Sequence, residues 1–105
     1  MVVSSMITDL VKIGSYLDVR NVAQVRGVLN DVIAAAEGDI IVDMAGVEMV
    51  DAAGLGMLTA AHLRAQRAGH HVVLRNCSDD VRRVFAVTHL NRVLHIDRRA
   101  VSLSA

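Results

Sequence analysis

Apolar residues along the chain recur at two spacings, and each spacing predicts one kind of element. Between Asn21 and Ala36 they return at three- and four-residue steps, which places them along one side of a helix. These positions are Val22, Val25, Leu29, Val32, Ile33 and Ala36. Gly38 is well placed to end this helix. A second helix begins near Ala53, and Gly69 is a natural stop for it. Its apolar face is predicted to carry Leu55, Leu58, His62 and Ala65.

Short apolar runs between these helices predict strands. They cover residues 6–17, 39–44, 71–75 and 93–96. The stretch that starts at Val47 is also predicted to begin extended before it becomes the second helix. The first run is broken at Gly14 and Ser15, so it predicts two extended pieces that meet there. The run at 39–44 is continuously apolar between its carboxylates, which is typical of a strand covered on both faces. The tail at 98–105 predicts a weakly ordered helix or coil.

A third helix is predicted after Ser78. Serine is a common N-cap, and the acidic residues Asp79 and Asp80 suit the first turn of a helix. Strands and helices then alternate in steps of about thirty residues, as in βαβ crossovers. The prediction is a small α/β domain with a mainly parallel or mixed sheet of four to five strands and helices packed against it. It forms one domain over residues 1–105, with a core from about 7 to 97 and short flexible termini.

Composition predicts an aliphatic core and a cytoplasmic location. Hydrophobic residues make up 53% of the chain, yet it has no Trp, one Phe and one Tyr. Cys77 is the only cysteine and cannot close an intramolecular disulfide. The start of the chain lacks the features of a secretory signal, and no run approaches the roughly 20 apolar residues of a membrane span. We therefore expect a cytoplasmic protein that does not insert into a membrane.

Charge is unevenly distributed along the chain. Residues 1–51 carry three basic and eight acidic side chains, and residues 52–105 carry eight and three, so the two halves are −5 and +5. In an interleaved α/β fold we expect the two halves to intermix and neutralise each other. The alternative is an acidic patch for a basic partner. No basic stripe carries interleaved aromatics, so nucleic-acid binding is not predicted.

Signatures of catalysis or of cofactor binding are incomplete. Gly54 and Gly56 open a helix as in a dinucleotide fingerprint, but Thr59 stands where a third glycine is needed. A phosphate-accepting receiver domain would need a lysine after a late strand, and the only lysine is Lys12. No nucleophile elbow of the G-x-S-x-G type exists. We therefore predict neither an enzyme nor a bound cofactor.

The histidines and the cysteine do not predict a metal site. No pair of the five histidines has the i, i+4 spacing of zinc-binding helices, and His70 and His71 point to opposite faces of a strand. We expect surface or packing roles for the histidines, and Cys77 to be a small buried filler.

Two carboxylates stand out by position. Asp18 and Asp51 each follow a predicted strand and precede a helix, and that edge of a parallel sheet is where ligands and partners bind. For Asp18 the alternative is a simple helix N-cap. For Asp51 it is a first-turn or capping carboxylate stabilised by the helix dipole.

The run MVDAAGLGMLTAAHLRAQRAGHHVVL resembles the signature of the STAS family: an Asp, two small residues, Gly-Leu-Gly, then an amphipathic helix and a strand. The segment SYLD, ending at Asp18, is similar to that family's glycine-x-leucine-aspartate turn, with Ser15 in place of the glycine. SDDVRRVFAVTHLNRVLHI resembles the family's third helix and closing segment. The likeness covers roughly residues 7–97.

This resemblance implies a regulatory function of the anti-sigma factor antagonist kind, in which the partner is an anti-sigma factor of the histidine-kinase-like ATPase type. In those proteins a serine or threonine before Gly-Leu-Gly is phosphorylated, and Ala53 stands there in this chain. Ala53 has no hydroxyl, and Thr59 would be a poor substitute. The surface would therefore remain competent for its partner. The partner-binding residues expected from the resemblance are Asp18, Asp51, Ala52, Ala53, Gly54, Leu55 and Gly56.

Two other functions would use the same edge of the sheet and remain open. One is an accessory STAS subunit of an ABC-type lipid transport system, docked on the cytoplasmic ATPase. The other is a nucleotide or small ligand bound at the helix N-terminus near Gly54. The sequence also leaves open whether the chain forms a homodimer.

Overall fold

The computed structural model describes residues 2–4 and 9–97. In chain order its elements are β1 (Val2–Ser4), β2 (Asp9–Lys12), β3 (Tyr16–Leu17), α1 (Val22–Ala35), β4 (Ile40–Asp43), β5 (Met49–Val50), α2 (Ala52–Arg67), β6 (Val72–Arg75), α3 (Asp79–Val87), the 3-10 helix η1 (Leu90–Arg92) and β7 (His95–Ile96). The predicted alternation of strands and helices is confirmed. The prediction for residues 98–105 lies outside the described residues.

Five strands form the main sheet in the order β1-β2-β4-β6-β7. β1 pairs antiparallel with β2, and the other pairs are parallel. The α/β class and the mixed, mainly parallel sheet are thus confirmed. The sequence analysis did not predict β1, which precedes the core expected to begin near residue 7. It did not predict η1 either.

The segments next to the two carboxylates pair outside this sheet. β3 and β5 form a separate two-stranded parallel sheet, with Tyr16 opposite Met49 and Leu17 opposite Val50. The break predicted at Gly14 and Ser15 is where the chain leaves β2 for β3. Two segments far apart in sequence therefore end side by side, each just before a helix.

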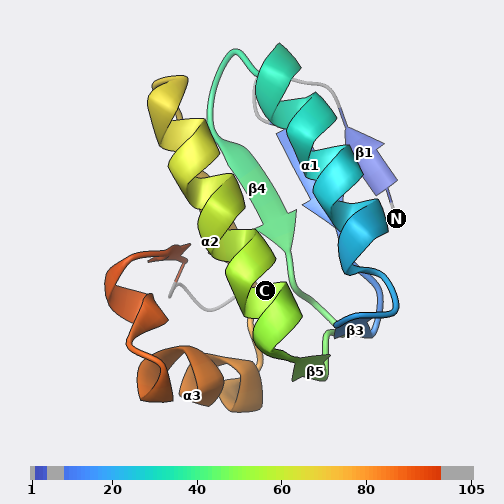
Figure 1. The fold of residues 1–105 in the computed structure, drawn as a ribbon, viewed down its shortest axis with the longest axis vertical. Coiled ribbons are helices and arrows are strands. Elements are labelled where there is room, and N and C mark those ends of the chain that lie inside the picture. The colour runs from blue at the N-terminus through green and yellow to red at the C-terminus, as the bar shows by residue number, and fades with distance from the viewer. Residues whose placement is uncertain (1, 5–8, 98–105) are drawn as a thin grey trace, which may run out of the picture.

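Helices α1 and α2 lie next to each other over one face of the main sheet (Figure 1). They bury the apolar stripes that their spacing predicted, and the Arg64 guanidinium on α2 donates a hydrogen bond to the Asn30 side chain on α1 at 2.5 Å. The three apolar residues of β4 (40–42) are all buried, which confirms a strand covered on both faces. The core is aliphatic apart from the buried ring of Phe85.

The ends of the helices largely follow local sequence. Ser78 caps α3 by accepting a hydrogen bond from the Val81 N–H at 3.2 Å, as predicted. Gly69, at φ 81°, takes the left-handed conformation that suits the residue after α2. The end of α1 differs from the prediction: its C-cap is Ala36, whose N–H bonds to the Ile33 carbonyl, and the helix ends before Gly38.

The two charged halves of the chain meet at the middle of the main sheet and between helices α1 and α2. Along the main sheet β1, β2 and β4 come from the first half, and β6 and β7 from the second. Among the described residues the arginine–carboxylate pairs are Arg20 with Asp18, Arg75 with Asp97, and Arg83 with Asp80. Each of these pairs joins two residues of the same half. The His71–Asp39 contact at 3.3 Å joins the two halves, and β4 of the first half pairs directly with β6 of the second. Neutralisation between the halves therefore stays a prediction.

Candidate functional site: the N-terminal end of helix α2

The carboxylate of Asp51 joins two segments at the start of α2. As the N-cap residue it accepts a hydrogen bond from the Gly54 N–H at 2.9 Å through Oδ1. Its Oδ2 accepts a second hydrogen bond at 3.3 Å from the N–H of Val19, in the loop between β3 and α1. The capping alternative for Asp51 is thus correct. The same side chain also fixes a loop 32 residues away in sequence.

Gly54 brings the first turn of α2 against β3. A Cβ at this position would lie 2.5 Å from the Leu17 carbonyl oxygen and 3.0 Å from side-chain carbons of Leu17 and Val50. No side chain fits in that space without a backbone shift. Gly56 differs, because a Cβ there would meet nothing within 4 Å. Gly54 is therefore required by close packing, and Gly56 is not.

Asp18 is 3% exposed and does not cap helix α1 with its side chain. The N-cap of α1 is Asn21, so the capping alternative for Asp18 is wrong. Instead the Asp18 carboxylate receives hydrogen bonds from the Arg20 backbone N–H at 2.8 Å and from the Arg20 guanidinium at 2.7–3.1 Å. The guanidinium bonds hold the pKa of the Asp18 carboxyl below its usual value, although burial acts in the opposite direction. The guanidinium also lies over the Tyr16 ring, 3.6 Å from its centroid.

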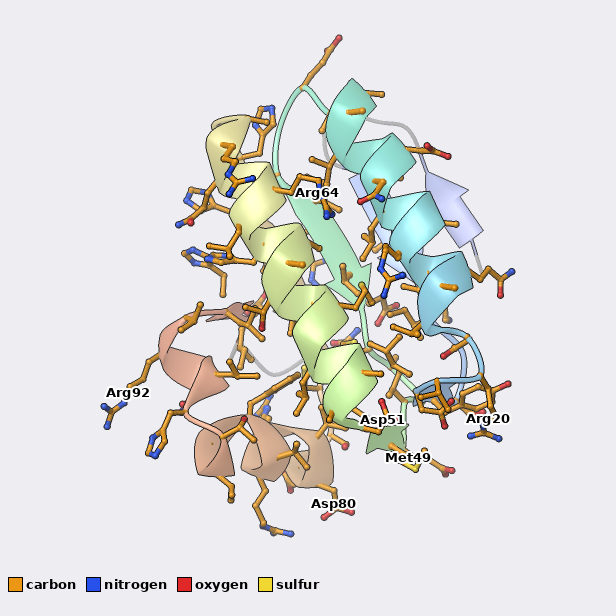
Figure 2. All side chains as sticks on the ribbon, in the orientation of Figure 1. Arg20, Met49, Asp51, Arg64, Asp80 and Arg92 are labelled. Carbon is orange, nitrogen blue, oxygen red and sulfur yellow. The ribbon has the colours of Figure 1, made fainter. Side chains whose placement is uncertain are left out.

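The structure brings the predicted residues together at one end of the domain. Ala52 and Gly56 are exposed, and Ala53 and Leu55 are half-buried against the core. The sequence analysis missed two apolar neighbours, Val19 and Met49, which are 72% and 45% exposed. No sequence signal marks them, since only the pairing of β3 with β5 places them here. Figure 2 shows Met49, Asp51 and Arg20 along this end of the domain.

We call this surface the α2 platform. It consists of Asp18, Val19, Met49, Asp51, Ala52, Ala53, Gly54, Leu55 and Gly56. Asp18 is paired with Arg20, and Asp51 accepts from two backbone N–H groups, so the platform presents exposed apolar side chains on a fixed frame. Thr59 is not part of the platform, because the residue is half-buried further along α2, where its hydroxyl donates to the Leu55 carbonyl at 2.9 Å.

Three histidines cluster away from the platform, between α2 and the β6–β7 edge. The His62 ring is 3% exposed and lies 5.4 Å from the His95 ring, which in turn lies 4.6 Å from the His71 ring. Burial lowers the pKa of His62, and the two neighbouring histidines lower it further. Within residues 2–4 and 9–97, no group of three or more His, Cys, Asp or Glu side chains is arranged to hold a metal ion.

Cys77 is buried, as predicted, and burial raises the pKa of its thiol to about 11. A thiol with so high a pKa is almost entirely protonated at neutral pH and is a poor nucleophile. Cys77 therefore has the properties of a packing residue.

The fold is a small α/β domain in which the first turn of α2 packs, at Gly54, against Leu17 of β3 and Val50 of β5. The family model of the STAS domain matches residues 6–102. The chain belongs to the STAS domain family. No curated protein matches it.

Solved structures show the same fold at low sequence identity. The anti-sigma-factor antagonist (STAS) domain protein from Planctomyces limnophilus has 18% identity and a TM-score of 0.79, covering 90% of this chain and 86% of that one. The Bacillus cell fate determinant SpoIIAA in its phosphorylated form has 20% identity and a TM-score of 0.69, covering 92% and 90%. The murine Solute Carrier 26 family member A9 anion transporter has 22% identity and a TM-score of 0.69, covering 85% of this chain but 16% of the transporter.

In the described part of the chain, every helix is too short or too polar to span a membrane.

Proposed function

We propose that this chain is a non-enzymatic regulatory module that binds a protein partner through the α2 platform, as an anti-sigma factor antagonist does. The partner is an anti-sigma factor of the histidine-kinase-like ATPase type, and the module acts in the cytoplasm on sigma-factor control of transcription. The observation that carries the proposal is the Asp51 carboxylate, which bonds both the Gly54 N–H and the Val19 N–H. It fixes the exposed Val19 and Met49 beside the start of α2.

The physical argument is pre-organisation. A surface whose loops are already ordered loses less conformational entropy on binding, and exposed apolar side chains are the usual core of protein interfaces. Here the Asp18–Arg20 pair and the Asp51 bonds order the loop, while Val19 and Met49 supply apolar area. Similarity to SpoIIAA and to the Planctomyces protein supports the choice of partner.

Ala53 keeps the proposed module permanently unphosphorylated at this position. A phosphate at this position would add about −1.5 to −2 charges beside the carboxylates Asp18 and Asp51. With no hydroxyl at residue 53, that repulsion does not arise, and the platform stays competent for its partner. Thr59 is a poor substitute, because it is half-buried and lies about a turn and a half further along α2 than residue 53.

A nucleotide at the start of α2 is less well supported than a protein. The N–H of Gly54 already donates to Asp51, and this carboxylate would repel a phosphate group. Isothermal titration with GTP and ATP tests that alternative directly. Heat signals at micromolar nucleotide would favour it over the protein partner.

The test introduces a negative charge on the platform. We expect Ala53→Asp and Ala53→Glu to weaken binding of the anti-sigma factor roughly 5- to 150-fold, the range of a coupling of about 1–3 kcal/mol. The thermal midpoint should change little. The matched control is Ala60→Asp, an exposed position about two turns further along α2. Affinities for both residue-53 variants that equal the unsubstituted protein would remove this face from the interface.

A pulldown from the native cytosol identifies the partner class. Recovery of a histidine-kinase-like anti-sigma factor supports the proposal. Recovery of a transporter ATPase without an anti-sigma factor would instead favour an accessory STAS subunit of an ABC-type lipid transporter. The same fold occurs in a sulfate transporter family protein from Wolinella succinogenes and in the murine anion transporter, which supports testing this second function.

A further inference from the structure

A second surface is formed where α3, η1 and β7 meet. A pocket of about 270 Å³ opens there, lined by Arg82, Ala86, Asn91 and Ile96. η1 carries Arg92, which points outward on the side of the domain opposite Arg20 (Figure 2). This pocket shares no residue with the α2 platform, so it can be examined independently of the proposed function.

Arg82 lines the pocket and has one N–H group that lacks a hydrogen-bond acceptor in the described part of the chain. Its Nε is buried and has no hydrogen-bond partner among the described residues. A buried donor on a cation that lacks a partner is costly, and native proteins normally satisfy it with protein, water or an ion. Nearby carboxylates have other partners: Asp80 pairs with Arg83 at 3.1 Å and Asp97 with Arg75 at 3.7 Å.

The remaining walls define the chemistry of a ligand. A guanidinium binds a planar carboxylate through two parallel N–H groups. The Asn91 amide adds a polar group, while the methyl group of Ala86 and the side chain of Ile96 form an apolar wall. Ligand pockets in proteins begin at about 300 Å³, so this volume suits a fragment-sized molecule.

The charges of the surrounding elements balance. Residues 79–97 carry three arginines and three carboxylates, and Arg83 is paired with Asp80. Selection of an anion therefore depends on Arg82 itself.

We propose that the pocket between α3, η1 and β7 binds a small organic acid, with its carboxylate on Arg82 and its apolar part against Ala86 and Ile96. The carboxylate can belong to a free organic acid or to an acidic residue of a peptide. Both sources use the same contacts.

The experiment follows backbone amide shifts of the ¹⁵N-labelled full chain at low salt during titration with hexanoate. We expect saturable shifts centred on α3, η1 and β7, and much weaker shifts with hexanamide, which has the same shape without the charge. An acetylated, amidated peptide with one glutamate between leucines forms a second arm. Tighter binding of the peptide identifies a protein source of the carboxylate, and tighter binding of hexanoate identifies a free acid.

Two variants separate the charge from the cavity. Arg82→Gln should weaken hexanoate binding at least about tenfold, because hydrogen bonds to charged groups contribute more than neutral ones. Ala86→Leu should also weaken it, by filling the apolar wall while Arg82 stays in place. The matched control, Arg83→Gln, removes an exposed neighbouring charge and should change affinity less than about twofold. The amide spectrum of each variant reports whether it is folded.

Three results would overturn the proposal. Equal shifts for hexanoate and hexanamide would show that Arg82 does not select a carboxylate. Unchanged hexanoate affinity in Arg82→Gln would place binding elsewhere. Inorganic phosphate that binds as tightly as hexanoate would show that the apolar wall contributes nothing.

Discussion

Helices α2 and α3 begin in the same way and are held in the domain in different ways. Each starts at a side-chain cap: Asp51 accepts from the Gly54 N–H, and Ser78 accepts from the Val81 N–H. Among residues 2–4 and 9–97, the Ser78 side chain makes no hydrogen bond beyond the first turn of α3. The cap of α2 also binds the Val19 N–H, and its first turn packs directly on the Leu17 backbone.

This difference separates a local signal from a tertiary one. A Ser followed by two acidic residues is enough to start a helix wherever the chain places it. The start of α2 instead contacts β3 and the loop after it, which are far away in sequence. These contacts hold the exposed apolar residues of the α2 platform in place. Substitutions that break these contacts at the start of α2 should therefore lower the free energy of unfolding more than matched substitutions that leave them intact.

The largest effect is expected for Gly54→Ala. The added Cβ would lie 2.5 Å from the Leu17 carbonyl oxygen, so the helix or β3 must move. We expect a loss of about 3 kcal/mol in the free energy of unfolding, at the upper end for overpacking. Urea denaturation followed by circular dichroism measures it.

Gly56→Ala is the matched control in the same turn. A Cβ there meets nothing within 4 Å, and alanine is favoured over glycine in a helix by about 1 kcal/mol. The substitution should leave the protein equally stable or slightly more stable. Equal losses for the two glycines would show that the close approach at residue 54 does not constrain the fold.

The two caps come next in size. Asp51→Ala should lower the free energy of unfolding by about 2 kcal/mol, because it removes two hydrogen bonds, and Ser78→Ala by about 1 kcal/mol, because it removes one. The two variants are compared by denaturant unfolding under identical conditions. A Ser78→Ala loss as large as that of Asp51→Ala would contradict the distinction drawn between the helices.

The smallest effect concerns the far half of α2, where His62 is buried against the β6–β7 edge. The groups that face it are His95 on β7 and His71 before β6, and His71 is paired with Asp39 at 3.3 Å. Because the pKa of His62 is lowered in the folded state, the unfolded chain binds a proton more readily below about pH 6.5. Stability should therefore fall as the pH drops through that value towards the lower folded pKa.

Thermal midpoints between pH 5 and 8 test this expectation. His62→Leu should flatten the pH dependence, since it removes the group that titrates differently in the two states. His89→Asn is the control, because His89 is exposed, lies outside the cluster and has the positive φ that asparagine tolerates. A curve for His62→Leu as steep as that of the unsubstituted protein would assign the pH dependence to other groups.

Several parts of the fold followed from local sequence. Apolar spacing predicted α1 and α2 to within a residue or two, and the Ser78 cap and the Gly69 stop were predicted at the correct residues. The continuous run at 39–44 predicted a doubly covered strand. β1 was missed because three residues that pair only through a long-range antiparallel ladder leave no periodic signal of their own.

The candidate site was predicted in part. Asp18, Asp51 and Gly54 were identified from position and resemblance, yet their individual roles were decided by contacts. Asp18 binds Arg20 instead of capping α1, and Asp51 spans two segments. The sequence pattern could not predict that the Arg82 Nε is buried without a hydrogen-bond partner among the described residues, because the partners of a buried group are its neighbours in space.

The sequence by itself determined which segments become helices and strands, where two of the helices start, and which family the chain belongs to, because these depend on propensity, spacing and a contiguous motif. The tertiary structure alone decided that β3 and β5 pair apart from the main sheet and that Val19 and Met49 are exposed beside Asp51. The reason is physical: strand order and burial depend on contacts between residues far apart in sequence, and no local pattern records them.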